Sequence, residues 1–340
     1  MEHEATVIRL CALLAALMVT SCGGKPSPPA GPTPVSGPDA LIFRAPLVDP
    51  AVVDFILPLG NLNPPGHTLP TDHIYFYVGF TRPQNRGVPV VAPGEGTVQG
   101  IFRNASDAKL FVRVNGMFAY YVDHVVLDAD IREGIRLAAG QRLGTSGLNS
   151  FGVDLGVTNA SRTLSFITPA RYSGDTLNAD APLKYYDEPL RGQLYTMVRR
   201  DGADKDGKID FDVAGHLSGN WFHESLAMSE STQPAGWPRH LAFVYDNVQP
   251  GQPRISIGGT LSLAGVFGVD PADPPFEAVG PESGLVRYTL RVGGLLGAPT
   301  GAAMGTLLVQ MLDGSRIRVE ALSSVNAPGT FSSAAQVYVR

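Results

Sequence analysis

The sequence predicts an all-β protein with two folded domains. Short apolar runs recur along the 340-residue chain, and turn-forming residues separate them. Glycine and proline number 39 and 28, which suits short strands and turns better than a bundle of long helices. Domains of about 100–200 residues are typical, so this length fits two domains that each bury a core.

The first domain is expected at residues 41–186. It contains no long segment with a 3.6-residue apolar period. Turn sequences at 93–96 and 115–116 are hairpin signals. The runs that they separate have the composition of strands and lie at 73–78, 88–92, 96–102, 109–114 and 118–127. The first domain is therefore predicted to be a β-domain.

The second domain is expected at residues 187–340 and is predicted to be an antiparallel barrel or sandwich. Residues 316–320 alternate cleanly between polar and apolar, which places one face of that strand in water. Further strands are expected at 194–200, 208–215, 240–246, 254–263, 285–294, 305–312 and 335–340. The stretch Gly219-Asn220-Trp221 resembles the GxW motif of lipocalin-like barrels, and we expect Trp221 to plug a barrel end. An apolar ligand inside the barrel is a further hypothesis, which an interior filled with side chains would exclude.

Charge and composition exclude several classes of protein. Lys and Arg number 26 against 31 Asp and Glu, which gives a formal net charge of −5. A nucleic-acid binder needs a basic face to neutralise phosphates, so no nucleic-acid partner is expected. No apolar run reaches the roughly 18 residues of a spanning helix, which argues against an integral membrane protein.

The N-terminus is predicted to be a lipoprotein signal peptide at 1–21. An unbroken apolar run at 10–19 has the length of a signal-peptide core and precedes Val-Thr-Ser-Cys22. These residues resemble a bacterial lipobox, which implies lipidation of Cys22, membrane attachment through a lipid anchor, and a place in the cell envelope. A plain secretory signal or a start codon further downstream is the alternative.

Two further features of the N-terminal region complete this prediction. Cys11 and Cys22 are the two cysteines, so the mature chain keeps no thiol for a disulfide, a nucleophile or a metal site. If the host is a Gram-negative bacterium, the absence of Asp at residue 23 resembles the signal for sorting to the outer rather than the inner membrane, facing the periplasm or the cell surface. Residues 22–40 hold six prolines and four glycines and are predicted to be a tether.

Two glycine-rich stretches of the first domain resemble the M23 (LytM-like) peptidoglycan metalloendopeptidases. Residues 87–98, GVPVVAPGEGTV, resemble the family's GTPVxAxxxGxV stretch, and 134–147 resemble its GxxVxxGQxIGxxG hairpins. His124 precedes the second stretch at about the distance of the family's YxHL histidine. The resemblance covers roughly residues 60–160 and implies a barrel-sandwich hybrid fold. Lipoyl and biotinyl carrier domains share this glycine framework, but they need an exposed lysine at a hairpin tip, and we identify none.

The family's chemistry needs one zinc, held by the His and Asp of HxxxD and by the second His of HxH. Three protein ligands leave an open position for water, as a catalytic zinc requires. His73 matches the first ligand by position, but Tyr77 stands where the Asp belongs. His67 and Asp72 form an HxxxxD, one residue too long to place both side chains on one face of a strand.

The HxH motif itself is absent. Residues 152–157 align with it, so that Asp154 replaces the first His and Gly156 replaces the zinc-ligand His. His124 is kept, and the resemblance implies that it assists the reaction. Taken singly, His73, His124 and Asp154 are ordinary strand or turn residues; taken together they indicate a vestigial active-site cleft.

Two hypotheses follow from this reading. The first is a cell-envelope lipoprotein whose M23-like domain is non-catalytic and binds peptidoglycan or an envelope protein, with no cofactor. The second is a zinc-dependent peptidoglycan endopeptidase with rearranged ligands. Its ligands would come from His67, Asp72, His73, His124 and Asp154.

Residues 201–209 resemble a calcium loop through Asp204 and Asp206. An EF-hand needs an acidic residue first and Glu at position twelve, and those positions are Gly202 and Ala214. A solvated Asp/Gly turn is the simpler interpretation, with an irregular calcium site as the alternative.

Overall fold

The computed structural model describes residues 40–82, 87–148, 150–293, 296, 300–327 and 329–340. The predicted signal peptide, the lipidation site Cys22 and nearly all of the tether lie outside the described residues. Residues 36–340 form one compact unit. Within the described ranges no helix has the length and apolarity to cross a membrane.

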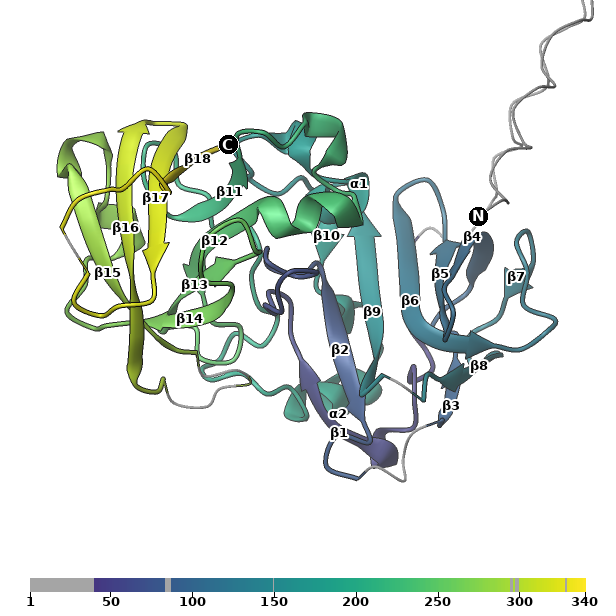
Figure 1. The fold of residues 1–340 in the computed structure, drawn as a ribbon. Helices are drawn as coiled ribbons and strands as arrows, with labels where there is room; N and C mark the ends of the chain where they lie inside the picture. Colours follow the sequence, from purple (N-terminus) through teal and green to yellow (C-terminus); the bar gives the residue numbers. More distant parts are fainter. Residues whose placement is uncertain (1–39, 83–86, 149, 294–295, 297–299, 328) are drawn as a thin grey trace, which may run out of the picture. The chain divides into compact units, whose positions relative to one another are not determined.

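The prediction of an all-β protein is confirmed (Figure 1). Among the described residues the α-helices are α1 (Gly174–Leu177) and α2 (Leu190–Thr196), and the other helical segments are short 3₁₀ turns. The strand predicted at 194–200 is wrong, because α2 occupies its first half, where Leu194 is the buried residue of the helix. Beyond the helix, Val198 forms only an isolated bridge with Ile56. The strand predicted at 208–215 is also wrong, since that segment is irregular.

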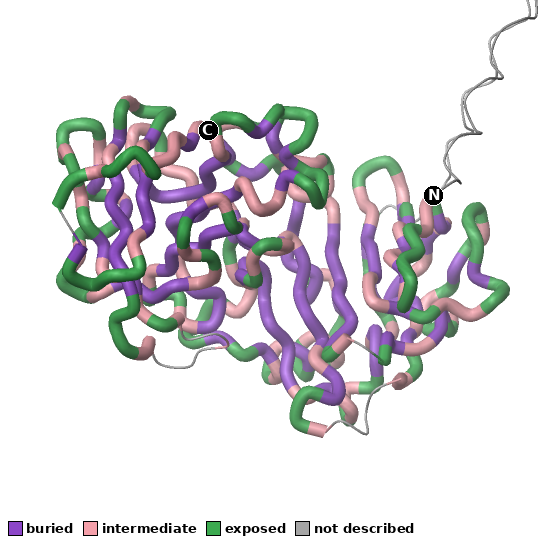
Figure 2. Tube along the Cα trace, viewed as in Figure 1, coloured by how far each residue is buried: buried purple, intermediate pink, exposed green. Residues whose placement is uncertain are grey.

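A ten-stranded antiparallel sheet occupies the first part of the chain, in the order β1-β2-β9-β6-β5-β4-β7 with β10, β3 and β8 paired beside it. The strands are β1 (Val53–Leu57), β2 (His73–Val78), β3 (Pro89–Val91), β4 (Gly96–Arg103), β5 (Ala108–Arg113), β6 (Phe118–Leu127), β7 (Arg136–Leu137), β8 (Arg142–Ser146), β9 (Gly152–Asn159) and β10 (Ala179–Asp180). Strand β9 lies between β2 and β6, and its first six residues are buried (Figure 2). This central strand positions the candidate site.

Residues 187–210, assigned to the second domain from the sequence, pack with this sheet. Leu194, Val198 and Ile209 belong to the same buried cluster as the strands. Ile56 in β1 forms a parallel bridge with Val198, and Leu59 forms another with Gly207. The barrel strands begin only at residue 219.

The second part of the chain is a closed antiparallel barrel, as one of the two sequence predictions stated. Its strands are β11 (Gly219–His223), β12 (His240–Tyr245), β13 (Pro253–Ile257), β14 (Gly265–Val269), β15 (Leu285–Val292), β16 (Ala303–Asp313), β17 (Arg316–Leu322) and β18 (Gln336–Val339). Closure comes from the pairing of β11 with β18.

Large side chains form the core of the barrel. Trp221, Phe243, Phe276 and Tyr288 are fully buried and belong to one apolar cluster. Trp221 donates its indole N–H to the carbonyl of Leu217 at 2.9 Å. A core of this kind is packed by its own side chains, which speaks against an apolar ligand inside the barrel.

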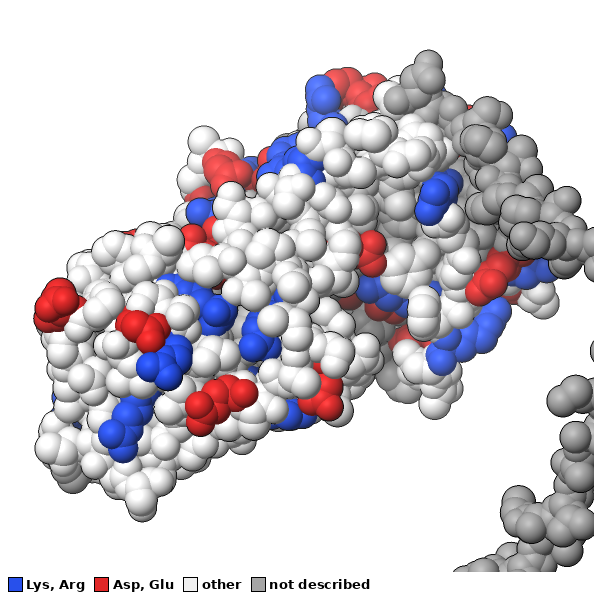
Figure 3. Space-filling view, turned by 90° about the horizontal axis from the view of Figure 1, so that it is seen from above, with Lys and Arg blue, Asp and Glu red and all other residues white. Residues whose placement is uncertain are grey.

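Arginine and carboxylate side chains alternate on the visible face of the molecule. Figure 3 shows blue and red groups side by side on a mostly uncharged surface, with no broad patch of one sign. Exposed ion pairs such as Arg316 with Asp313 at 2.8 Å occur among the described residues. On this face there is no basic surface of the kind that nucleic acid requires.

Candidate functional site

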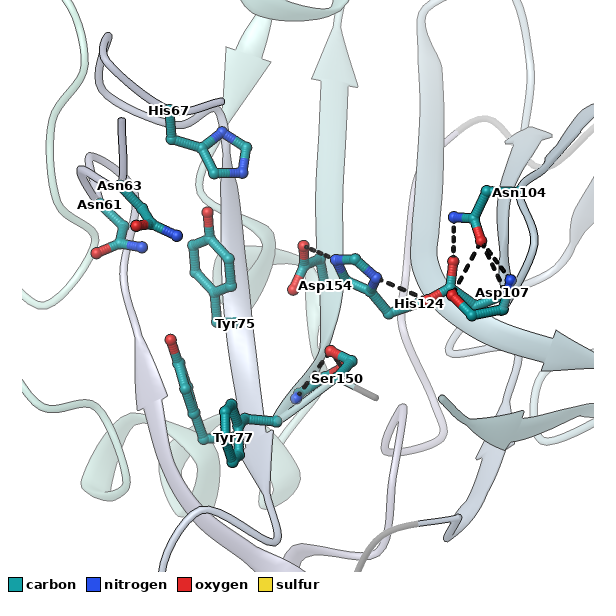
Figure 4. Close-up of a pocket in the computed structure, with 13 residues that line it drawn as sticks. Asn61, Asn63, His67, Tyr75, Tyr77, Asn104, Asp107, His124, Ser150 and Asp154 are labelled. Carbon is teal, nitrogen blue, oxygen red and sulfur yellow. Dashed lines mark hydrogen bonds and ion pairs between the residues drawn. The ribbon is translucent and has the colours of Figure 1, made fainter. Parts of the chain in front are cut away.

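A cavity of about 390 Å³ opens beside β2, β9 and β6 (Figure 4). The strands contribute Tyr75 and Tyr77 from β2, Asp154 from β9 and His124 from β6. Loops complete the wall with carboxamide, hydroxyl, imidazole and aromatic groups: Asn61, Asn63, His67, Asn104, Ser106, Asp107, Ser150 and Phe151. The lining is mostly polar, with a few aromatic faces.

Strand register explains how these side chains meet. Tyr75 lies opposite Asp154 across the β2–β9 ladder, and Asp154 lies opposite Asp123 across the β9–β6 ladder. Residues two apart on a strand share a face, so His73 and Tyr77 lie on the same face of β2 as Tyr75.

The buried carboxylate of Asp154 lies between two imidazoles. Its Oδ2 is 3.4 Å from Nε2 of His73 and 3.5 Å from Nε2 of His124. Asp154 is only 3% exposed. Burial raises the pKa of Asp154 above its ordinary value, and the two histidines only partly offset this effect. The Nε2 atom of His73 is buried and has no hydrogen-bond partner.

His124 stands at a break in strand β6. The strand pairs with β9 as far as Asp123 and with β8 from Val125 onward. His124 takes a φ of 64° at this break, a backbone conformation that costs about 1–3 kcal/mol for a residue other than glycine. The side chain of His124 points toward Asp154 and lines the cavity (Figure 4).

Three carboxylates surround His124. Its Nδ1 lies 3.1 Å from Oδ2 of Asp107, and its backbone N–H donates to Oδ1 of Asp123 at 2.7 Å. Partial burial would lower the pKa of His124, but Asp154, Asp123 and Asp107 outweigh it and raise that pKa above its ordinary value. The charged imidazolium is therefore favoured here.

The opposite side of His73 is held by a hydrogen-bond network. Oδ1 of Asp72 lies 3.0 Å from Nδ1 of His73 and accepts the phenol O–H of Tyr121 at 2.6 Å. Thr176 donates to Oδ2 of Asp72 at 2.5 Å. Burial alone would raise the pKa of Asp72, but these hydrogen bonds hold it below its ordinary range. Asp72 thus fixes the orientation of His73.

His67 borders the cavity without joining this network. Its ring centre lies 5.4 Å from that of His73. Burial and then the nearby His73 lower the pKa of His67 to about 3. His67 is therefore neutral at physiological pH.

The position expected for the third zinc ligand is filled by another side chain. Tyr121 lies directly opposite Gly156, and a Cβ atom on Gly156 would come within 2.3 Å of two carbons of the Tyr121 ring. A histidine at residue 156 would therefore require Tyr121 to move. At the Asp position of HxxxD, Tyr77 instead stacks on Phe55 at 4.7 Å between ring centres.

The remaining residues do not fit a tetrahedral zinc site. Within the described part of the chain, a single group of three has ligand atoms all within 4.8 Å of one another: Asp107, Asp123 and His124. That group omits His73 and Asp154, and hydrogen bonds within it already engage Asp107 and Asp123. The structure thus brings the predicted site residues into one region, but not around one point.

The two aspartates of the predicted calcium loop are engaged by other groups. Asp206 lies 3.3 Å from the ammonium of Lys184 and accepts the phenol O–H of Tyr195 at 2.6 Å. Asp204 pairs with Arg200 at 3.3 Å. Oδ1 of Asp204 also accepts the backbone N–H of Asp206 at 3.0 Å, which closes a hydrogen-bonded turn.

Several residues of the site were not identified from the sequence. Asp107 and Tyr121 have no motif of their own and become partners of the site through strand register. The pairing of Tyr121 on β6 with Gly156 on β9 shows that the ligand position is filled, but only once the strand register is known. The asparagines at 61 and 63 come from a loop that no pattern connects to the site.

Comparison with known proteins gives partial structural resemblances. No protein-family model and no curated protein matches the sequence. Among solved structures, a zinc-containing peptidase from Vibrio cholerae is 18% identical with a TM-score of 0.29, covering 36% of this chain and 38% of its own. The M23 metalloprotease pseudoalterin is 16% identical with a TM-score of 0.27, and the match covers 42% of this chain and 88% of pseudoalterin. A chain of the SpoIIQ–SpoIIIAH pore-forming complex is 12% identical with a TM-score of 0.30, and the match covers 44% of this chain and 94% of that chain.

The chain spans little more than a third of the length of the Vibrio cholerae peptidase. The functional conclusion accordingly depends on the side chains of the site.

Proposed function

We propose that this protein is a cell-envelope lipoprotein whose first cavity binds peptidoglycan, or an envelope protein, without cleaving it. The observation that carries the proposal is the Tyr121 ring over Gly156, in the place where the sequence resemblance requires a zinc ligand. A catalytic zinc needs three protein ligands and an open position, and Tyr77 and Gly156 remove two of the three.

The cavity lining supports binding of a polar polymer. Asn61 and Asn63 present carboxamides that both donate and accept hydrogen bonds, whereas the carboxamide of Asn104 is engaged by Ser106 and Asp107. Phe151 is exposed at the rim, and its ring packs edge-on against Phe80 at 5.8 Å. Sugar hydroxyls and peptide amides match the carboxamides, while the aromatic faces cover the apolar side of a sugar ring.

Co-sedimentation with purified peptidoglycan sacculi tests this proposal. The full chain is expected to pellet with the sacculi, and Asn63→Ala combined with Tyr77→Ala is expected to reduce the bound fraction at least about fivefold. Glu282→Gln, an exposed change in the barrel, is the matched control. Release of muropeptides in a metal-dependent way would refute the non-catalytic role, and absence of sedimentation would leave the envelope-protein partner to be sought by cross-linking.

A second candidate is a zinc endopeptidase with rearranged ligands. It is favoured by the position of Asp154 between the Nε2 atoms of His73 and His124. Binding of one zinc per chain, abolished by His124→Gln, would support it. The spread of the ligand atoms makes it the weaker candidate.

A further inference from the structure

A second cavity contains a buried arginine that has no acidic partner. Arg171 ends a 3₁₀ turn at Pro169–Arg171 and is 7% exposed. Its Nη1 donates to the carbonyl of Leu226 at 3.2 Å and to the hydroxyl of Ser231 at 3.1 Å. Among the described residues no carboxylate forms an ion pair with it, and its Nε is buried without a hydrogen-bond partner.

An uncompensated buried cation is costly for a folded protein. Removing one partner of a buried ion pair is strongly destabilising, because the remaining charge is left without compensation. Burial accordingly lowers the pKa of Arg171. The ring of Phe222, 4.7 Å from the guanidinium carbon, offers only a weaker cation–π contact. An anion held beside Arg171 would supply the missing partner.

Two further residues that line the same cavity of about 260 Å³ each carry a buried polar atom that has no hydrogen-bond partner among the described residues. Asn220 is 1% exposed and donates Nδ2 to the hydroxyl of Tyr172 at 3.1 Å, which leaves its Oδ1 as an unused acceptor. His240 is 4% exposed, and its Nε2 has no partner. Burial lowers the pKa of His240 to about 4, so its ring is neutral at physiological pH.

The charges around this cavity favour an anion. Lys109 lines it as a second cation, with its ammonium 3.7 Å from the ring centre of Tyr121 and no ion pair among the described residues. Asp72 is the carboxylate in the lining, and His73, Tyr121 and Thr176 already engage it through hydrogen bonds.

We propose that this cavity binds the carboxylate of an amino acid or of a peptide C-terminus. Among the described residues the hydrogen bonds of the Arg171 guanidinium come from Nη1, so its Nε and Nη2 edge has no hydrogen-bond partner. Such an edge holds a carboxylate through two parallel hydrogen bonds. The Oδ1 atom of Asn220 accepts the N–H group next to that carboxylate. A volume of about 260 Å³ is below the roughly 300–1,000 Å³ of sites for drug-sized ligands, so a small molecule or the end of a longer one fits.

Isothermal titration calorimetry of the full chain tests this site. The probes are alanine, alanyl-alanine, alanyl-alanine amide and inorganic phosphate. Alanyl-alanine is expected to bind, and its amide, which lacks only the carboxylate, is expected to bind at least about tenfold more weakly. Arg171→Met is expected to abolish the difference between the two peptides, and Arg171→Lys to restore it in part. Arg239→Gln, which removes a nearby cation paired with Glu230, is the matched control.

Each outcome decides for or against the site. Tighter binding of alanyl-alanine than of alanine identifies a peptide end, and equal binding identifies a free amino acid; both support the proposal. Equal affinity for the dipeptide and its amide, no binding of either, or phosphate bound as tightly as the dipeptide would overturn it. The comparison of peptides uses the unaltered protein, so it stands even if Arg171→Met fails to fold. Sacculus binding is measured separately and can fail without affecting this result.

Discussion

Asp154 shows how residue-scale chemistry limits what the first cavity can do. Its carboxylate lies between His73 and His124 at ion-pair distances, so it interacts with two imidazoles at once. The strained backbone at His124 and the hydrogen bonds of Asp72 hold these rings in place. Such a group is suited to holding and sharing a proton, and its fixed charges orient a polar ligand.

A pH dependence of stability follows from His67. Its folded pKa of about 3 lies below the ordinary value of 6.5, so its contribution is complete above about pH 6.5 and is lost as the pH falls toward 3. The free energy of unfolding is expected to be lower at pH 5 than at pH 8 by about 2 kcal/mol from this residue. His67→Gln should remove that part of the slope. Urea unfolding of both proteins at the two pH values measures it, and an unchanged slope in His67→Gln would contradict the burial of a neutral imidazole.

At the scale of elements, strands β9 and β6 decide the character of the site. A small residue on β9 accommodates a large one on β6, because Tyr121 packs over Gly156. This packing uses the space that a ligand histidine would occupy. The absence of a histidine at residue 156 and the packing of Tyr121 over this position therefore have one structural explanation.

Gly156→Ala tests this packing. The added methyl group would meet the Tyr121 ring at 2.3 Å, and overpacking of this kind costs about 1–3 kcal/mol. Thermal unfolding is expected to show a destabilised variant. In a double-mutant cycle, Gly156→Ala should be nearly neutral when it is made in a protein that already carries Tyr121→Ala. Independent, additive effects of the two changes would show that the ring is not the obstacle.

The sequence predicts where the strands lie, but it does not predict which strands pair or in what register. Alternation and turn residues locate strands such as 316–322, since both signals are local. Register depends on contacts between distant segments, so the meeting of Tyr121 with Gly156 has no local signal. The cleft around His73, His124 and Asp154 was predicted through the resemblance. The cavity that contains Arg171 was not predicted, because the sequence alone does not distinguish a buried arginine from an exposed one.

At the scale of the whole molecule, the folded unit is predicted to be attached to a membrane. The predicted lipidation site Cys22 lies about 18 residues before the first described residue, in a segment rich in proline and glycine. A tether of this composition would let both cavities reach ligands at a distance from the membrane surface.

Cys22→Ser tests the anchor. Two acyl chains or more hold a protein stably on a membrane, and Cys22→Ser removes the residue predicted to carry them. The wild-type chain is expected in the membrane fraction and Cys22→Ser in the soluble fraction. Equal partitioning of the two would contradict lipidation at this residue, and Thr20→Ser, a small change beside the cleavage site, controls for altered processing.

The zinc content of the purified full chain tests the central claim most directly. The protein is prepared without an affinity tag, incubated with zinc, freed of excess metal and measured by mass spectrometry. The ring of Tyr121 over Gly156 and the spread of the remaining ligands predict far less than one zinc per chain. One tightly held zinc per chain, lost in His124→Gln or His73→Gln, would contradict the non-catalytic role and restore the peptidase hypothesis.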